Sequence, residues 1–159
     1  MALFKKSPAK IRLLVLGTGG MARAHATAFA QDPRVEMVGT VDVVPGRAAE
    51  FAKKFGIKKH FTDLDKAIAW GQFDAAANVT PDAIHYPTTM KLLNAKKHVF
   101  CEKPLAENFK LADEMATTAE KHKLINMVNL TYRNVPAIHV AKKLVDSGEL
   151  GEIRHVEAS

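Results

Sequence analysis

Apolar runs of strand length alternate along this chain with segments of helical spacing. The first run, Ile11 to Leu16, stops at Gly17, and small and apolar residues then recur with helical spacing from Met21 to Phe29. Later apolar runs lie at 35–41, 60–61, 73–79, 98–101 and 125–129, and a last one begins near residue 153. The segments between these runs predict helices over 45–55, 63–70, 84–94, 108–122 and 135–147.

This alternation predicts the fold class. Strands that alternate with helices form parallel βα units, because a parallel pair needs a long crossover connection. We therefore expect an α/β fold: a Rossmann-type, doubly wound parallel sheet in three layers. The domain predicted in this way spans residues 11–150 and follows a short basic N-terminal tail at residues 1–10.

The composition is typical of globular proteins. The chain has 159 residues, of which 47% are hydrophobic and 25% charged, enough for one domain with a sizeable core. No apolar stretch approaches the length of a membrane span, and the basic tail lacks the pattern of a signal peptide. We expect a cytoplasmic protein that has no membrane partner.

The cysteine and lysine positions argue against two further kinds of partner. The single Cys101 excludes an internal disulfide, and no Cys/His cluster has metal-ligand spacing, so we expect no metal. The net charge of +6 includes lysine pairs that are scattered over expected helix ends and faces. Lysines near helix C-termini interact favourably with the helix dipole and stay solvated. Because this explains the lysine pairs without a bound ligand, we expect no nucleic-acid partner.

The first expected strand meets its helix at the turn Gly17-Thr18-Gly19-Gly20-Met21-Ala22. In dinucleotide-binding folds one glycine makes the tight turn, a second lets the backbone approach the pyrophosphate, and helix N–H groups face the anion. Ala22 stands at the third glycine position and is small enough for close helix–strand packing. A tight strand-to-helix connection without a ligand is the alternative interpretation.

Asp42 ends the second apolar run, at the distance from this turn where a carboxylate binds the adenosine ribose hydroxyls. Together with the turn it predicts NAD as the cofactor, because a carboxylate repels the extra phosphate of NADP. Arg47 keeps NADP possible, since an arginine shortly after the second strand can accommodate a 2′-phosphate. Asp42 also has a structural interpretation as a helix cap, because Pro45 could open the next helix.

Three later strands are also expected to end in polar residues, at the sheet edge where ligands bind in such folds. These groups are Asn78-Val79-Thr80-Pro81-Asp82 with His85, Glu102-Lys103-Pro104, and Asn129 to Arg133. Thr80-Pro81-Asp82 is equally consistent with a turn and a helix start. Glu102 and Lys103 could form a solvated charge pair, but Pro104 favours a fixed backbone that directs both side chains into the cleft.

Other polar residues have simpler interpretations. Tyr132 and Arg133 are consistent with packing and surface charge. His25 and His85 each lie early in an expected helix, where a packing or hydrogen-bonding role is favoured over proton donation.

Taken together, these motifs closely resemble the Gfo/Idh/MocA oxidoreductases. The resemblance covers nearly the whole chain from Ile11, and its most specific part is the triplet Glu102-Lys103-Pro104. It implies a Rossmann domain that binds NAD or NADP. In full-length members a second α+β domain follows, which holds the substrate and supports homo-oligomers.

The resemblance also implies roles for single residues. The glycine turn holds the pyrophosphate, Met21 lies beside the nicotinamide ribose, and Asp42 binds the adenosine ribose. The other half of the cofactor is lined by Val79, Thr80, Pro81 and His85.

For the reacting end, the resemblance implies that Glu102 binds the nicotinamide ribose and that Arg133 lies at the rim of the site. Lys103 faces the nicotinamide and the substrate hydroxyl, and it is the catalytic residue expected in this chain. A lysine there is suited to orient an alcohol or to relay its proton.

The sequence departs from the family pattern at its end. The chain stops at Ser159, so residues 151–159 are expected to be the start of a truncated second domain, which would carry the family's acid/base pair. We expect this chain alone to be inactive.

The function expected from the resemblance is that of an oxidoreductase. It would transfer a hydride between a nicotinamide cofactor and a hydroxyl of a polyol, sugar or sugar derivative. A non-catalytic dinucleotide sensor and an NAD-dependent glycosidase of the same family are the alternatives, and Lys103 favours the enzyme.

Overall fold

The computed structural model describes residues 9–157, which belong to two compact units divided after Asn129. Of the predicted basic tail, residues 1–8 lie outside the described part, as do residues 158–159 at the other end. The first unit contains the sheet and the helices that cover it, and the second contains the residues from Leu130 onward.

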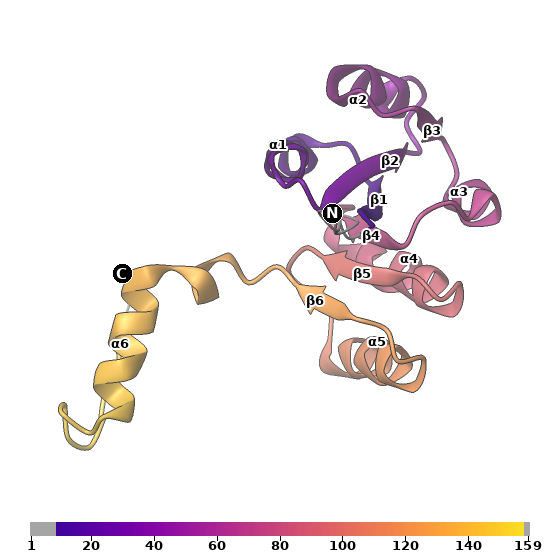
Figure 1. The fold of residues 1–159 in the computed structure, drawn as a ribbon. Coiled ribbons are helices and arrows are strands. Elements are labelled where there is room, and N and C mark those ends of the chain that lie inside the picture. Colours follow the sequence, from indigo (N-terminus) through magenta and orange to yellow (C-terminus); the bar gives the residue numbers. More distant parts are fainter. Residues whose placement is uncertain (1–8, 158–159) are drawn as a thin grey trace, which may run out of the picture. The chain divides into compact units, whose positions relative to one another are not determined.

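The first unit is built on a six-stranded parallel sheet with the order β3-β2-β1-β4-β5-β6 (Figure 1). Its strands are β1 (Ile11–Leu16), β2 (Val35–Val41), β3 (Lys59–Phe61), β4 (Ala75–Asn78), β5 (His98–Cys101) and β6 (Asn126–Val128). The chain starts in the middle, winds outward to β3, and returns past β1 to build the other half. The predicted doubly wound α/β sheet is therefore confirmed.

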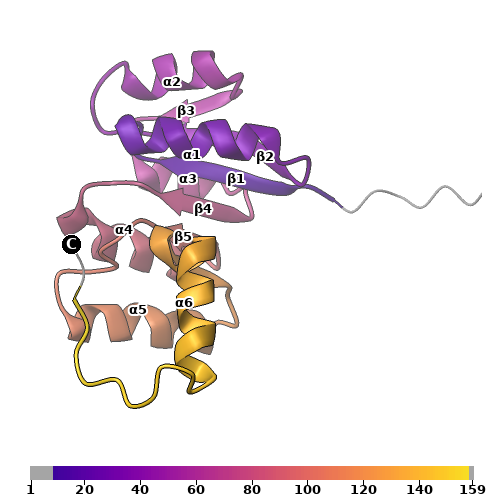
Figure 2. The same cartoon turned by 90° about the vertical axis from the view of Figure 1, so that its left-hand side faces the viewer.

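Helices cover both faces of this sheet, as Figures 1 and 2 show. The first face carries α1 (Gly20–Gln31) and α2 (Arg47–Phe55). The opposite face carries α3 (Leu64–Trp70), α4 (Asp82–Asn94) and α5 (Phe109–Lys121). This arrangement gives the three layers expected from the sequence.

The central strand β1 shows why the layers form. Its buried side chains point alternately to the two faces of the sheet. Val15 packs with Ala22 and Ala26 of α1. Leu14 and Leu16 belong to the larger cluster under α3, α4 and α5. Because successive side chains of a strand point to opposite faces, a continuous apolar run such as Leu13 to Leu16 can fill two cores at once. All three of these β1 side chains are buried.

The helix ends follow local signals in the sequence. Asp63 caps α3 by accepting a hydrogen bond from the Asp65 N–H at 2.7 Å, and Asn108 caps α5 in the same way through Leu111. Gly56 and Gly71 end α2 and α3 in the left-handed conformation that glycine tolerates. These ends set the short connections that return each helix to the sheet.

The second unit holds a 3₁₀ turn, η1 (Thr131–Asn134), and the helix α6 (Pro136–Asp146), none of whose side chains is buried. The strand expected from Ile153 is wrong: residues 151–157 contain no strand in the described chain. A strand forms only where a neighbouring strand accepts and donates its backbone hydrogen bonds, and residues 130–157 provide none.

Candidate functional site

Backbone hydrogen bonds align the carboxyl ends of the six strands in one row. In each adjacent pair, the residue just after one strand donates its N–H to the last carbonyl of the neighbour, over 2.8–3.1 Å. The donors are Gly17, Asp42, Val79, Glu102 and Asn129. The polar groups that the sequence places after separate strands thus lie along one edge of the sheet.

The glycine turn at the end of β1 combines one crowded position with two open ones. Gly17 has φ +87°, and a Cβ there would lie 2.5 Å from the carbonyl oxygen of Val79. A Cβ at Gly19 or Gly20 would meet nothing within 4 Å. Gly19 is the N-cap of α1 and offers no side-chain cap, so the first N–H groups of the helix have no capping side chain.

This geometry fits a dinucleotide. The open positions at Gly19 and Gly20 leave room for a phosphate to approach the backbone, where uncapped N–H groups and the helix dipole favour an anion. Gly17 makes the turn itself, since no other residue tolerates both its φ and its contact with Val79.

Asp42 lies directly beside this turn. Its Oδ2 accepts hydrogen bonds from the N–H and the hydroxyl of Thr18 at 3.0 and 2.5 Å, and its Oδ1 accepts the N–H of Val44 at 2.9 Å. Burial by itself raises the pKa of Asp42, but these bonds and the charge of Arg47 outweigh it, so the net pKa is lowered. The carboxylate is therefore ionised at neutral pH.

The alternative role of Asp42 as a helix cap is wrong. Helix α2 begins at Arg47 after Gly46, and no side chain caps its N-terminus. Asp42 closes a local turn with Val44 instead, which keeps the carboxylate at the carboxyl edge of the sheet.

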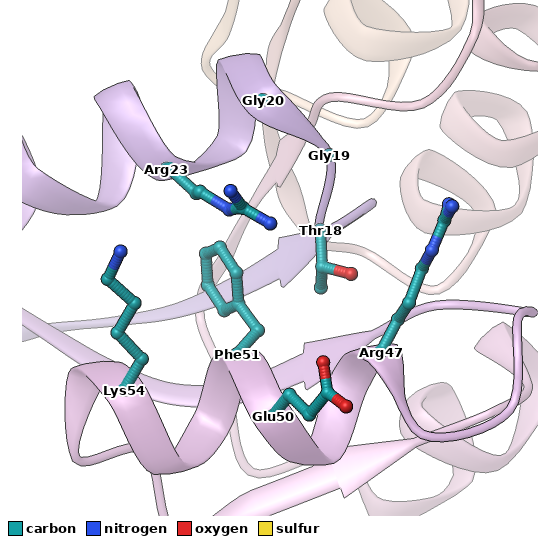
Figure 3. Close-up of a pocket in the computed structure, with 8 residues that line it drawn as sticks. All are labelled: Thr18, Gly19, Gly20, Arg23, Arg47, Glu50, Phe51 and Lys54. Atoms are coloured by element: carbon teal, nitrogen blue, oxygen red, sulfur yellow. The ribbon is translucent and has the colours of Figure 1, made fainter.

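A pocket of about 490 Å³ opens next to the glycine turn, between α1 and α2 (Figure 3). Its lining combines the turn with side chains from both helices: Thr18, Gly19, Gly20, Arg23, Arg47, Glu50, Phe51 and Lys54. Three cationic side chains and one carboxylate make this pocket predominantly positive. In Figure 3, Phe51 lies beside Lys54 on α2, and Arg23 extends from α1 above the ring.

The end of β4 is held by a buried polar network. Oδ1 of Asn78 accepts the hydroxyl of Thr80 at 2.7 Å, while its Nδ2 donates to hydroxyls in α4. Pro81 is the N-cap residue of α4, so Thr80-Pro81-Asp82 does form the expected turn and helix start. Thr80 and Val79 remain partly accessible, and Pro81 is exposed.

His85 lies beneath this turn rather than at its surface, because its ring is fully buried. Nε2 lies 2.8 Å from the carbonyl oxygen of Thr80, and Nδ1 lies 2.7 Å from that of Pro104. A neutral ring donates to one of these oxygens and a protonated ring to both. His85 thus bridges the loops after β4 and β5, the hydrogen-bonding role that its sequence position favours.

Glu102, directly after β5, is buried with 6% of its surface exposed. Oε1 receives His25 Nε2 at 2.5 Å and Asn129 Nδ2 at 2.7 Å, and Oε2 accepts the N–H of Lys103 at 3.1 Å. Burial raises the pKa of Glu102, but the bonds from Asn129 and His25 outweigh it and lower the net value. The solvated pair with the Lys103 side chain is therefore not formed.

The remaining predicted residues lie in accessible positions. Lys103 is exposed, and its ammonium has no hydrogen-bond or ion-pair partner in residues 9–157. Met21, on the first turn of α1, is 55% exposed. Arg133 belongs to η1 in the second unit, so its place at the site stays a prediction.

Sequence reasoning missed some of these contacts. Arg23 and Lys54 gave no signal as pocket residues, because their positions matter only once α1 and α2 lie side by side. Asn129 and His25 could have been linked to Glu102 by their places, one after a strand end and one in the second turn of α1.

The described residues contain no group of three or more His, Cys, Asp or Glu side chains placed to hold a metal ion. None of the helices in residues 9–157 is long and apolar enough to cross a membrane.

Comparison with known proteins connects this geometry to a family. Residues 11–130 match the Gfo/Idh/MocA model, described as an oxidoreductase family with an NAD-binding Rossmann fold. The chain is 34% identical over 146 residues to glucose-6-phosphate 3-dehydrogenase of Bacillus subtilis, covering 90% of this chain and 40% of that protein. It is 29% identical over 149 residues to the NADP⁺-dependent scyllo-inositol 2-dehydrogenase IolU of the same organism, with 94% and 45% covered.

Among solved structures, the fold is similar to scyllo-inositol dehydrogenase from Lactobacillus casei with bound NAD(H) and scyllo-inositol. The TM-score is 0.83 at 28% identity, over 91% of this chain and 43% of that one. The chain thus spans less than half the length of these relatives. With the glycine turn, Asp42 and Glu102 on one sheet edge, and the family match over residues 11–130, the chain belongs to the Gfo/Idh/MocA oxidoreductases and forms their NAD-binding Rossmann domain.

Proposed function

We propose that this chain is the cofactor half of a dehydrogenase acting on a hydroxyl of a polyol, sugar or sugar derivative. The observation that carries the proposal is the single row of strand ends, in which the glycine turn, Asp42, Thr80 and Glu102 share one edge. Nicotinamide supplies the hydride acceptor or donor when bound. The relatives named above act on sugar phosphates and inositols according to their names, which supports this substrate class.

Each end of the cofactor has its own set of residues in this proposal. The uncapped N–H groups at Gly19 and Gly20 bind the pyrophosphate, and Asp42 accepts the adenosine ribose hydroxyls. Val79, Thr80 and Pro81 line the other half, where their accessible surfaces meet the ligand. His85 contributes through the two loops that its ring bridges.

Lys103 is the residue we assign to catalysis. Its ammonium is exposed and unpaired among the described side chains, next to Glu102, whose Oε2 still has capacity to accept a ribose hydroxyl. As an ammonium, this side chain can orient the substrate oxygen by a donated hydrogen bond and can give a proton to that oxygen when a carbonyl is reduced. In the oxidation direction it takes the proton of the hydroxyl only as the neutral amine. Met21 and Arg133 are proposed to flank the same end.

We propose NAD as the preferred cofactor. Asp42 is ionised and stands where the 2′-hydroxyl would bind, so a 2′-phosphate would meet a like charge. The positive pocket at Arg23, Arg47 and Lys54 supports NADP as the second possibility, as does the NADP⁺ in the name of the relative IolU. Glu50 in the same lining reduces the attraction for phosphate.

Calorimetric titration of the chain with NAD and NADP tests this assignment. We expect NAD to bind more tightly, and Asp42→Ala to weaken NAD by about tenfold or more while improving NADP relative to NAD. Arg47→Ala is the matched variant, because it removes a charge from the pocket without touching the carboxylate. Tighter NADP binding that Arg47→Ala abolishes would overturn the preference for NAD, and no binding of either would overturn the proposed cofactor site.

The proposal extends to the whole protein. We infer that residues 151–159 begin a substrate domain, that the full-length protein is a cytoplasmic homo-oligomer, and that this chain alone does not turn over substrate. The chain covers 40% and 43% of the length of two relatives, which supports a substrate domain separate from this cofactor-binding domain. Turnover of an inositol or sugar phosphate by the isolated chain would contradict it, and light scattering on the full-length protein tests its assembly.

A further inference from the structure

Glu102 receives three donors from three different parts of the first unit. His25 reaches it from α1, Asn129 from the end of β6, and the backbone of Lys103 from the adjacent residue. The sequence separations are 77 residues for His25 and 27 for Asn129, so the carboxylate joins segments that only the folded sheet brings together.

The two oxygens of this carboxylate are used unequally. Each carboxylate oxygen has about two acceptor positions. Oε1 is filled by His25 Nε2 at 2.5 Å and Asn129 Nδ2 at 2.7 Å, whereas within residues 9–157 Oε2 accepts only the N–H of Lys103, at 3.1 Å. One acceptor position is therefore left, and it belongs to Oε2.

Packing fixes the orientation of the His25 ring. The ring stacks on Phe29 with centroids 6.0 Å apart and meets Phe100 edge-on at 5.4 Å. Its side chain is only 14% exposed. Because Nε2 faces a carboxylate oxygen, this nitrogen carries the proton in either charge state of the ring. His25 is thus a preset donor, and rotation away from Glu102 would disturb an aromatic cluster.

We propose that His25 and Asn129 are positioning residues: they saturate Oε1 of Glu102 so that Oε2 is its one acceptor directed at a cofactor hydroxyl. In this role each acts through Glu102, to which it donates a hydrogen bond. The two hydrogen bonds from His25 and Asn129 form a clamp on Glu102. This clamp also fixes the backbone at Lys103, whose N–H donates to the same carboxylate. This inference rests on the proposed cofactor role of Glu102, and it adds the reason why a buried carboxylate is held ready before the cofactor arrives.

The first test compares two substitutions at His25 by NAD titration. His25→Leu keeps apolar contact with the phenylalanines but removes the donor, and we expect NAD affinity to fall about tenfold. His25→Gln keeps an N–H within reach of Oε1, and we expect affinity within about threefold of the original. His60→Leu, at an exposed histidine of β3, is the matched control and should bind normally. Equal effects of Leu and Gln at His25, or none, would overturn the proposal.

A second measurement does not depend on the cofactor. The carboxyl ¹³C resonance of Glu102 reports its pKa directly, and we expect His25→Leu and Asn129→Leu each to raise it while His25→Gln leaves it lowered. If His25→Leu fails to fold, Asn129→Leu tests the clamp from the opposite side. An unchanged Glu102 titration in the folded variants would overturn the clamp.

A separate variant, Glu102→Gln, tests the proposed cofactor role of Glu102 itself. If Glu102→Gln binds NAD as tightly as the original chain, the cofactor role of Glu102 is wrong. The carboxyl titrations in the His25 and Asn129 variants would still show whether these side chains clamp Glu102.

Discussion

Thr18 donates two hydrogen bonds to one oxygen of Asp42, from its backbone N–H at 3.0 Å and from its hydroxyl at 2.5 Å. The contact joins the glycine turn after β1 to the end of β2, across 24 residues of sequence. The carboxylate assigned to the adenosine ribose therefore also braces the turn assigned to the pyrophosphate.

Replacing Thr18 by Val should weaken this brace without changing the shape of the side chain. We expect the free energy of unfolding at pH 7 to fall by about 1 kcal/mol, below the full value of a bond to a charged group because Asp42 is half-buried. Urea unfolding measures the change. Thr27→Val is the control, since the Thr27 hydroxyl donates to the Arg23 carbonyl of its own helix and to nothing else in the described part of the chain. An equal loss in both variants would contradict the prediction.

The glycines of the turn should separate folding from cofactor binding. Gly17→Ala places a Cβ 2.5 Å from the Val79 carbonyl at φ +87°, so we expect a loss of about 3 kcal/mol or more, or no folding. The Cβ of Gly19→Ala meets no other described residue within 4 Å beyond its own chain neighbours, so this variant should fold with unchanged or slightly higher stability. Its methyl group enters the space assigned to the pyrophosphate, so NAD affinity should fall. Normal NAD binding by Gly19→Ala would contradict this use of the space.

Acid should destabilise the fold through carboxyl groups whose pKa folding lowers. Hydrogen bonds from Arg34 lower the pKa of the exposed Asp32 to about 2, and three further carboxyl groups join segments that are distant in sequence. Hydrogen bonds from Arg12 lower the pKa of Asp74, and hydrogen bonds outweigh the effect of burial to lower those of Asp42 and Glu102. Their ordinary values are 3.8 for Asp and 4.5 for Glu. A pKa lowered by folding contributes stability that is present above the unfolded value and lost as pH falls through the folded value.

We therefore expect the contribution of these carboxyl groups to the free energy of unfolding to stay constant from about pH 7 to 5 and to fall below about pH 4.5. Urea unfolding at a series of pH values measures this. In Asp74→Asn the slope below pH 4 should be smaller, because one of these carboxyl groups no longer titrates. A slope identical to that of the original chain would show that Asp74 does not contribute.

Cys101 should be unreactive in the folded chain. Its side chain is buried, and burial raises the pKa of the thiol to about 11. Because the thiolate is the nucleophile, both the low thiolate fraction and the lack of access slow alkylation. We expect iodoacetamide to label Cys101 at pH 8 only as fast as the chain unfolds, with rapid labelling in urea. Fast labelling under native conditions would indicate local opening of β5.

The sequence predicted the features that depend on neighbours along the chain. The order of strands and helices follows from apolar runs such as Ile11 to Leu16, and the doubly wound sheet follows from that order. The turn at Gly17 and the carboxylate at Asp42 could be located because each stands directly after a strand. The strand expected from Ile153 failed for the complementary reason: an alternating pattern forms a strand only beside a partner.

Only the tertiary structure decided which side chains meet. The contact of His25 with Glu102 spans 77 residues, and the two carbonyls at His85 come from separate loops. The pocket cations Arg23 and Lys54 come together because α1 and α2 pack on the same face of the sheet. Periodicity states which residues are buried and where strands end, whereas hydrogen bonds over a few ångströms depend on register and rotamer, which packing sets.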